Sequence, residues 1–171
     1  DFYDVEVNVS GTLIHIIGSH LKAMSGATNE QRREWEQEGI INYMDNLGSI
    51  PIVYLGDLNS FFPEDWGLNT FQSGLGYSPL SMMVSPYNNP ATGGDYTAYS
   101  SIIHNWIDVY RTLNPANWGI TYPNPTYKSR IDFIYVNQFL ASEVINSTTG
   151  DTDHALTGSD HLTVDVFINL S

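Results

Sequence analysis

The chain has 171 residues, 42% hydrophobic and 13% aromatic, with no apolar run of membrane-spanning length, so its composition predicts a single soluble globular domain over residues 1–171. The formal net charge of −13, with six Lys and Arg in total, argues against a basic grip on a phosphate backbone and favours the recruitment of a cation if the protein handles phosphates. Cysteine is absent, which excludes disulfides and thiolate metal sites.

Glycosylation sequons begin at Asn8, Asn146 and Asn169, and lysine is scarce while Asn, Ser, Thr and Tyr are plentiful. This composition favours an extracellular or cell-surface location. The chain starts without Met and opens directly onto a strand pattern, which predicts a processed or truncated protein.

The first elements are two strands. Val5, Val7 and Val9 alternate with polar residues, which predicts a strand with one wet face. The stretch TLIHIIGSHL, residues 12–21, is apolar on both faces and predicts a central strand that ends near His20.

One convincing helix is predicted between Thr28 and Gly48. Thr28 and Gln31 fit a capping box, and Gly48 suits the C-terminal cap. Trp35 is expected on the same buried face as Ile40, with a charged, solvated face opposite.

The rest of the chain predicts three strands, over residues 50–60, 129–137 and 161–170, separated by long loops. Residues 60–101 are rich in turn-forming residues and are interpreted as loops, with a short helix near 66–72. Residues 105–113 suit a helix or a strand. Strands separated by one helix and long loops predict an α/β sandwich with helices outside packed sheets.

Asp57 and Asn59 follow a buried strand. Two residues apart on extended chain, they should point the same way and could hold a cation's water or a phosphate oxygen. The alternative is a helix cap or an Asx turn.

Asp132 lies within an otherwise apolar strand, where a buried carboxylate needs a cation or a histidine as partner. The alternative is a structural ion pair with Arg130 or Lys128.

Two histidines also lie next to predicted strands. Asp160 and His161 precede the last strand, and their alternative is a turn acid beside a surface imidazole. His20 suits catalysis or an ordinary hydrogen-bonded histidine.

Four motifs occur in an order and spacing that resemble the endonuclease/exonuclease/phosphatase superfamily, which includes pancreatic deoxyribonuclease, abasic-site endonucleases, sphingomyelinases and inositol-polyphosphate phosphatases. They are GSHLKA (18–23), VYLGDLNS (53–60), TYP (121–123) followed by SRIDFIYV (129–136), and GSDHLTVDV (158–166). The resemblance spans nearly the whole chain and implies a deoxyribonuclease-I-like α/β fold, a two-sheet β-sandwich flanked by helices.

The resemblance also implies roles for matching residues. His161 would contact the scissile phosphate or act as general base, with Asp132 orienting it. Asp57 would align or deprotonate the attacking water, and Asn59 would stabilise developing charge on phosphorus.

The remaining implied roles concern the second histidine and the metal. His20 matches the second histidine of deoxyribonuclease-like members. Asp160, together with Asp57, would bind Mg²⁺, Mn²⁺ or Ca²⁺, and attack would be in line.

The sequence departs from the family in lacking an N-terminal half, which normally supplies an early Asn and a metal-binding Glu. The chain is therefore interpreted as the C-terminal portion of the domain, completed by its N-terminal half or by another chain. We expect a metal-dependent phosphodiester hydrolase, most similar to a nuclease. The alternatives are a sphingomyelinase-like phospholipid phosphodiesterase, and a non-catalytic binding or assembly module with a vestigial site.

Overall fold

The computed structural model describes residues 2–61, 65, 79–84, 104–126, 128–150 and 158–170. The helix expected near 66–72 lies outside these residues, as does most of the loop region between 60 and 101.

The larger sheet has five strands in the order β1-β2-β3-β5-β4. Its strands are β1 (Phe2–Val9), β2 (Thr12–His20), β3 (Ile52–Asp57), β4 (Ile107–Asp108) and β5 (Asp132–Val136). Only β2 and β3 pair in parallel, and the helix α1 (Ala27–Leu47) connects them. Parallel neighbours need such a long crossover, because a tight hairpin can join only antiparallel strands.

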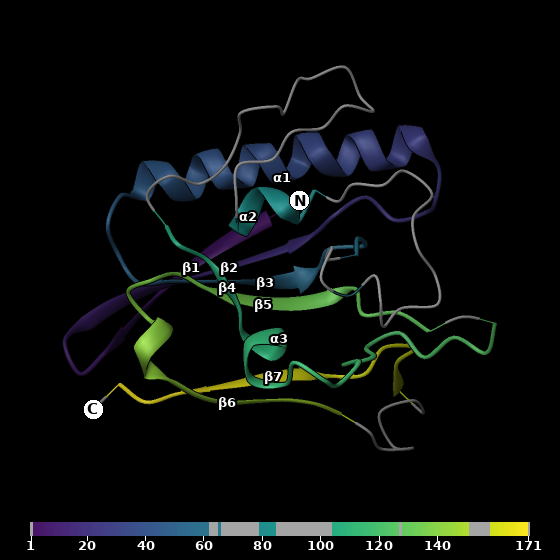
Figure 1. Cartoon of the computed structure of the whole chain (residues 1–171). Coiled ribbons are helices and arrows are strands. Elements are labelled where there is room, and N and C mark those ends of the chain that lie inside the picture. Colours follow the sequence, from purple (N-terminus) through teal and green to yellow (C-terminus); the bar gives the residue numbers. More distant parts are fainter. Residues whose placement is uncertain are drawn as a thin grey trace.

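A second, two-stranded antiparallel sheet is formed by β6 (Val144–Thr149) and β7 (Val164–Ile168). Three short helices complete the described elements: α2 (Ser81–Val84), α3 (Val109–Leu113) and the 3₁₀ turn η2 (Ala141–Glu143). In Figure 1, α1 covers one face of the large sheet, while α3 and the small sheet lie on the other. The predicted two-sheet α/β sandwich with a helix outside is confirmed.

Each face of the large sheet has its own core. The core toward α1 contains Ile17, Tyr54, Met44 and Phe133. The core between the two sheets includes Ile14, Val53, Ile134 and Val136, with Val164, Val166 and Ile168 of β7 packed against it. Alternate residues of β2, β3 and β5 supply the two cores, as expected for strands buried on both sides.

The helix α1 follows the predicted range, but its faces do not. Its N-cap is Gly26 without a side-chain cap, so the predicted capping box is wrong, whereas Gly48 is the C-cap as predicted. Trp35 is 51% exposed, so its predicted burial is also wrong. The buried face carries four polar residues, Glu30, Arg33, Glu34 and Gln37, as well as Ile40, Ile41 and Met44. Polar partners satisfy most of this face, which a hydrophobic pattern does not reveal.

The polar side of β1 is not simply a wet face. Asp4 points toward α1, where its Oδ2 accepts a hydrogen bond from Tyr43 at 2.8 Å and contacts His15 Nδ1 at 2.7 Å. Val5 points toward the core between the sheets, yet it is 49% exposed. Burial on the two sides of β1 therefore does not follow side-chain hydrophobicity.

Three other segments differ from their predicted secondary structure. Residues 105–113, left open between helix and strand, contain both: β4 and then α3. The last strand begins at Val164, so His161 lies in the preceding turn. The strand β6 was not predicted, because its residues VINSTT are mostly polar and only one face is covered.

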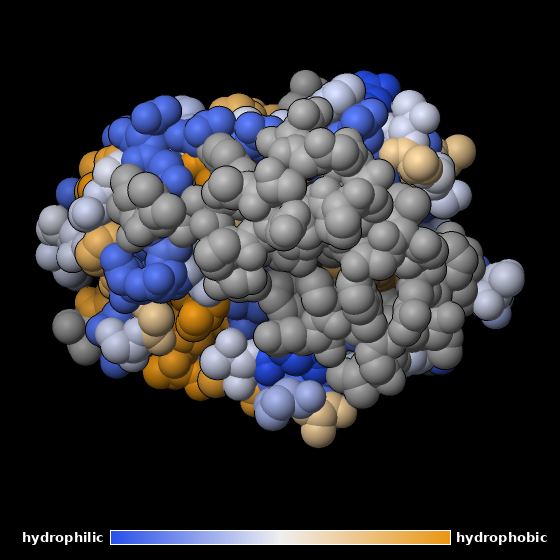
Figure 2. All heavy atoms as spheres, turned by 45° about the horizontal axis from the view of Figure 1, so that its top comes forward, coloured by the Kyte–Doolittle hydropathy of each residue, from blue (hydrophilic) through white to orange (hydrophobic). Residues whose placement is uncertain are grey.

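The surface combines charged and apolar areas. Figure 2 shows hydrophilic residues in the upper left of the view and a smaller apolar area below them. The larger exposed hydrophobic residues are Phe2, Tyr3, Val5, Leu13, Met24, Trp35, Leu113, Phe139, Ile145 and Phe167. None of the helices in the described part of the chain has the length and apolar character to cross a membrane.

Candidate active site

Three polar residues share one row of the large sheet. His20 of β2 is the register partner of Asp57 of β3, and Asp57 is the register partner of Asp132 of β5. Register partners on neighbouring strands point to the same face. That face is the one turned toward the small sheet, so the row lies at one end of the core between the sheets.

A glycine next to this row lets two strands come close together. Gly56 has φ of 147°, and a Cβ atom placed on it would lie 1.8 Å from the carbonyl oxygen of Ser19. Only glycine fits such an approach. The sequence GD at the end of β3 therefore has a structural reason for its glycine and leaves the aspartate at the strand end.

His161 joins the row from the turn before β7. Its Nδ1 lies 2.8 Å from Asp132 Oδ2, and its Nε2 lies 3.9 Å from Asp57 Oδ2. With Nδ1 bound to the carboxylate, Nε2 is the ring nitrogen that faces Asp57. The structure thus gives Asp132 a histidine partner, one of the two kinds predicted for a carboxylate in an apolar strand.

Thr121 holds the backbone beside both Asp132 and His161. Its buried Oγ1 accepts hydrogen bonds from the backbone N–H groups of Ile131 and Asp132, both at 3.1 Å. Its carbonyl oxygen accepts the N–H of Leu162 at 2.7 Å. The neighbouring Tyr122 ring lies 5.1 Å from the His161 ring. These two residues begin the TYP motif, but no role was predicted for them.

The electrostatics of the site favour protonation. Burial raises the pKa of Asp57, the charge of Asp132 raises it further, and the N–H of Asn59 and the two histidines only partly oppose this rise. For His161, burial lowers the pKa, but the hydrogen bond and charge of Asp132, with the charges of Asp57 and Asp160, outweigh burial and raise it. Two carboxylates facing each other thus create a local demand for positive charge.

Asn59 lies beside Asp57, although not by the predicted route. It has φ of 46°, so the chain is no longer extended there, and the prediction that Asp57 and Asn59 lie on extended chain is wrong. Its N–H donates to Asp57 Oδ1 at 3.0 Å, and its Nδ2 donates to the carbonyl of Leu21 at 3.2 Å. The bond to Asp57 forms an Asx-type turn, which was the alternative prediction for these two residues. This turn nevertheless lies within the site.

The other two predicted residues lie at the margin. His20 is 68% exposed at its side chain, with Nε2 3.6 Å from Asp57 Oδ2. Asp160 is exposed and acts on His161 through its charge.

Asp57, Asp132 and His161 offer three ligand atoms within 4.8 Å of one another, so this group could hold a metal ion. Hard cations prefer carboxylate oxygens, and the carboxylate pair suits them. Three ligand atoms are fewer than such ions require. Asp160, predicted as a ligand, is outside this group, so its role as a metal ligand stays a prediction.

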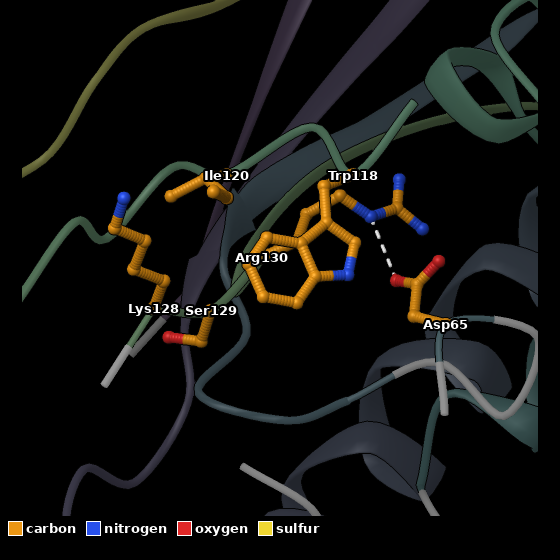
Figure 3. A pocket seen from close by; sticks show the side chains of 6 residues that line it. All are labelled: Asp65, Trp118, Ile120, Lys128, Ser129 and Arg130. Carbon is orange, nitrogen blue, oxygen red and sulfur yellow. Dashed lines mark hydrogen bonds and ion pairs between the residues drawn. The ribbon is translucent and has the colours of Figure 1, made fainter. Parts of the chain in front are cut away.

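Of the two alternative partners for Asp132, Arg130 is engaged elsewhere. Arg130 donates to Asp65 Oδ2 at 2.8 Å and to Asp108 Oδ1 at 2.9 Å, and Arg111 also binds Asp65. This buried network flanks the pocket in Figure 3, which Asp65, Trp118, Ile120, Lys128, Ser129 and Arg130 line. The pocket belongs to the ion network and is lined by none of the predicted site residues.

Comparison with known proteins gives structural likeness only. No family model matches the sequence, and no curated protein sequence matches it. An abasic-site endonuclease from Archaeoglobus fulgidus superposes with a TM-score of 0.62 at 16% identity, covering 98% of this chain and 65% of its own.

Two further solved structures are similar. One is an endonuclease/exonuclease/phosphatase protein from Beutenbergia cavernae, with a TM-score of 0.59 at 18% identity over 98% of this chain and 39% of its own. The other is a Neisseria 3′ phosphatase bound to a product DNA hairpin, with a TM-score of 0.55 at 18% identity over 97% of this chain and 64% of its own. This chain therefore spans less than two thirds of each, and over that span it has the fold of endonuclease/exonuclease/phosphatase proteins.

Proposed function

We propose that this chain carries the phosphate-contacting half of a divalent-metal-dependent phosphodiester hydrolase that acts on nucleic acid. The observation that supports this most is the group formed by Asp57, Asp132 and His161, in which a carboxylate–imidazole pair faces a second carboxylate. Neighbours with this fold include an abasic-site endonuclease and a phosphatase solved with product DNA, which favours nucleic acid over phospholipid.

The chemistry follows from the protonation states. A raised pKa suits Asp57 to accept the proton of an attacking water, since a base works best when its pKa approaches the working pH. A raised pKa keeps His161 protonated to a higher pH, so that Nε2–H can donate to a phosphate oxygen while Asp132 holds Nδ1. Asn59 and His20 would contact the same phosphate.

The reaction balances as a hydrolysis. The water oxygen attacks phosphorus in line with the leaving oxygen, and its proton passes to Asp57. The bond from phosphorus to the leaving oxygen breaks, the leaving oxygen takes a proton from solvent, and Asp57 returns its proton to solvent. A Mg²⁺ or Mn²⁺ ion held by Asp57, with Asp160 nearby, would supply Lewis acidity. The protein's own residues place the water, the phosphate and the proton acceptor.

We also propose that a further segment of the same protein, encoded ahead of Asp1, covers the open end of the core between the sheets. Tyr3 and Val5 point to that core but are 60% and 49% exposed, and the small sheet has two strands in the described part of the chain. Large exposed apolar residues on a sheet face are typical of a binding surface. Similar structures are longer than this chain, which leaves room for such a segment.

This second proposal is tested by amide hydrogen exchange. Backbone amides of β1 should gain protection when the chain is produced together with the upstream segment, relative to the chain alone. Unchanged protection would contradict the proposal, and protection produced by a separate chain would assign the surface to that chain instead.

The function is tested by incubating the protein, with its upstream segment, with supercoiled plasmid and Mg²⁺. We expect nicking that EDTA abolishes and that Asp57→Ala or His161→Ala reduces by about 10²–10⁴-fold. Asp165→Ala, an exposed acid on β7, is the matched control and should retain activity.

Release of phosphocholine from sphingomyelin with no nicking would identify a phospholipid enzyme instead. Unchanged activity in both site variants would contradict the site assignment, and inactivity on every phosphodiester would favour a binding module.

A further inference from the structure

The segment between β2 and α1 links the candidate site to the buried polar face of the helix. Leu21 N–H donates to the carbonyl of Asp57 at 3.0 Å, and the Leu21 carbonyl accepts from Asn59 Nδ2 at 3.2 Å. Both bonds join this segment to the chain at the end of β3. The side-chain amide of Asn59 is therefore oriented by a backbone carbonyl that itself must be held in place.

The helix α1 holds that segment from the other side. Arg33 Nη1 donates to the carbonyls of Lys22 at 2.6 Å and Met24 at 2.9 Å, and Glu36 Oε2 accepts the N–H of Lys22 at 2.7 Å. We call residues 21–24 the tether. The tether is bonded to the helix at Lys22 and Met24, and to the site at Leu21.

Arg33 is itself fixed by a buried partner. Arg33 is 4% exposed and donates through Nε to Glu30 Oε2 at 3.1 Å, and Glu30 is equally buried. A buried guanidinium with a carboxylate partner has few alternative positions. Its two remaining bonds go to the tether carbonyls, so the ion pair serves to hold the tether.

The backbone of the tether also needs support. Met24 has φ of 82° although it is not glycine, and its side chain is 73% exposed. Such a conformation persists only when surrounding contacts enforce it. The hydrogen bond from Arg33 to the Met24 carbonyl is a contact of this kind, because packing of the Met24 side chain does little.

We propose that Arg33, fixed by Glu30 and assisted by Glu36, is a positioning residue that orients the Asn59 amide toward the phosphate through the tether. The Nδ2 group of Asn59 carries two hydrogens, and only one is used by Leu21. The other has no acceptor among the residues that the structure describes, and it is the donor offered to a phosphate oxygen. This inference rests on the proposed function.

Two variants separate positioning from folding. The double variant Glu30→Leu, Arg33→Met removes the ion pair without leaving a buried charge unpaired. Glu36→Ala removes only the half-buried acceptor of the Lys22 N–H, and it keeps the inference testable if the double variant fails to fold. Arg32→Ala, an exposed arginine next to Arg33, is the matched control.

The first measurement needs no activity. Nitrogen-15 NMR of the Asn59 side-chain amide should show hydrogen exchange at least about tenfold faster in both variants than in the parent protein and in Arg32→Ala, because the bond to Leu21 is loosened. Asn124, whose Nδ2 donates to Tyr122 far from α1 in sequence, serves as an internal reference. An unchanged Asn59 amide would overturn the inference.

The second measurement is a double-mutant cycle on kcat for plasmid nicking. Each tether variant should lower kcat about tenfold with Asn59 present, since misplacement of a positioned group by less than 1 Å can have this effect. In the Asn59→Ala background the further loss should be under about twofold. Equal losses in both backgrounds would overturn the inference, because Arg33 would then act by another route.

The two measurements separate this inference from the proposed function. Suppose that the variants exchange the Asn59 side-chain amide faster, but the parent protein hydrolyses no phosphodiester. This result would overturn the proposed function, and with it the catalytic purpose of the tether. Normal hydrolysis, together with an unchanged hydrogen-exchange rate of the Asn59 side-chain amide in the tether variants, would overturn only the inference about the tether.

Discussion

Arg130 and Arg111 meet Asp65 and Asp108 in a buried network in which every charge has an opposite partner. In the candidate site, by contrast, Asp57 and Asp132 face each other with the His161 imidazole between them and the exposed His20 beside Asp57. In the first region, the charges of the four described residues balance one another. The second carries an excess of negative charge at a strand end, and this imbalance distinguishes a group arranged for a cation and a phosphate from one arranged for stability.

The largest effect is expected at Arg130, in the buried arginine network. Arg130→Met leaves Asp108 and Asp65 without one of their partners in a buried setting, so we expect a loss of about 3–5 kcal/mol in the free energy of unfolding. Urea unfolding followed by circular dichroism measures this loss. Lys128→Met, two residues away on the same pocket, should change stability by less than about 0.5 kcal/mol. Equal losses in both variants would show that the network is not the source.

Mg²⁺ should stabilise the protein through the candidate site and not through the arginine network. Mg²⁺ at about one hundred times its dissociation constant should stabilise the protein by about 2.7 kcal/mol. Thermal unfolding across a Mg²⁺ titration measures this gain, which Asp57→Asn should abolish and the exposed Asp165→Asn should preserve. A gain that survives Asp57→Asn would place the cation elsewhere.

The same substitution should have opposite signs in the two regions. In EDTA, Asp57→Asn relieves the repulsion from Asp132 and should raise the free energy of unfolding by roughly 1 kcal/mol, whereas Asp108→Asn should lower it. The Asn59 N–H bond to residue 57 can persist, because asparagine keeps an acceptor oxygen. Destabilisation by Asp57→Asn would mean that the site carboxylates support the fold.

The smallest effect concerns pH. Because the folded state raises the pKa of His161 above its usual value near 6.5, the stability that this group contributes is fully present below pH 6.5 and is lost as pH rises through the raised pKa. Without metal, the free energy of unfolding should fall over that window, and His161→Gln should flatten the fall. His104→Gln, a buried histidine outside the site, is the comparison variant, and an identical slope in His161→Gln would contradict the assignment.

The sequence predicted the strand-end residues because their positions depend on local pattern. Asp57 was predicted at a strand end and Asp132 inside a strand, and the structure makes Asp132 the first residue of β5. Strands rich in β-branched and aromatic residues are recognisable without a partner. The pairing of His161 with Asp132 was expected only through the resemblance to known enzymes. Roles for His20, Asn59 and Asp160 in a reaction stay predictions.

Part of what the sequence did not predict depends on partners distant along the chain. Arg130 binds Asp65, 65 residues away, so no local pattern indicates that it is unavailable to Asp132. The buried polar face of α1 was missed for a different reason, because the partners of Arg33 lie near it in the sequence: Glu30 within the same helix and the tether just before it. Hydrophobic periodicity describes apolar burial and cannot detect polar burial.

The row that joins His20, Asp57 and Asp132 has a consequence for how the protein can be altered. The spacing of these residues is set by ladder hydrogen bonds and is independent of the length of the segments that connect the strands. Insertions, or a circular permutation placed in those connections, should therefore leave the row intact. A slip of β5 by one residue would carry Asp132 to the side of α1 and disassemble the site without removing a single residue.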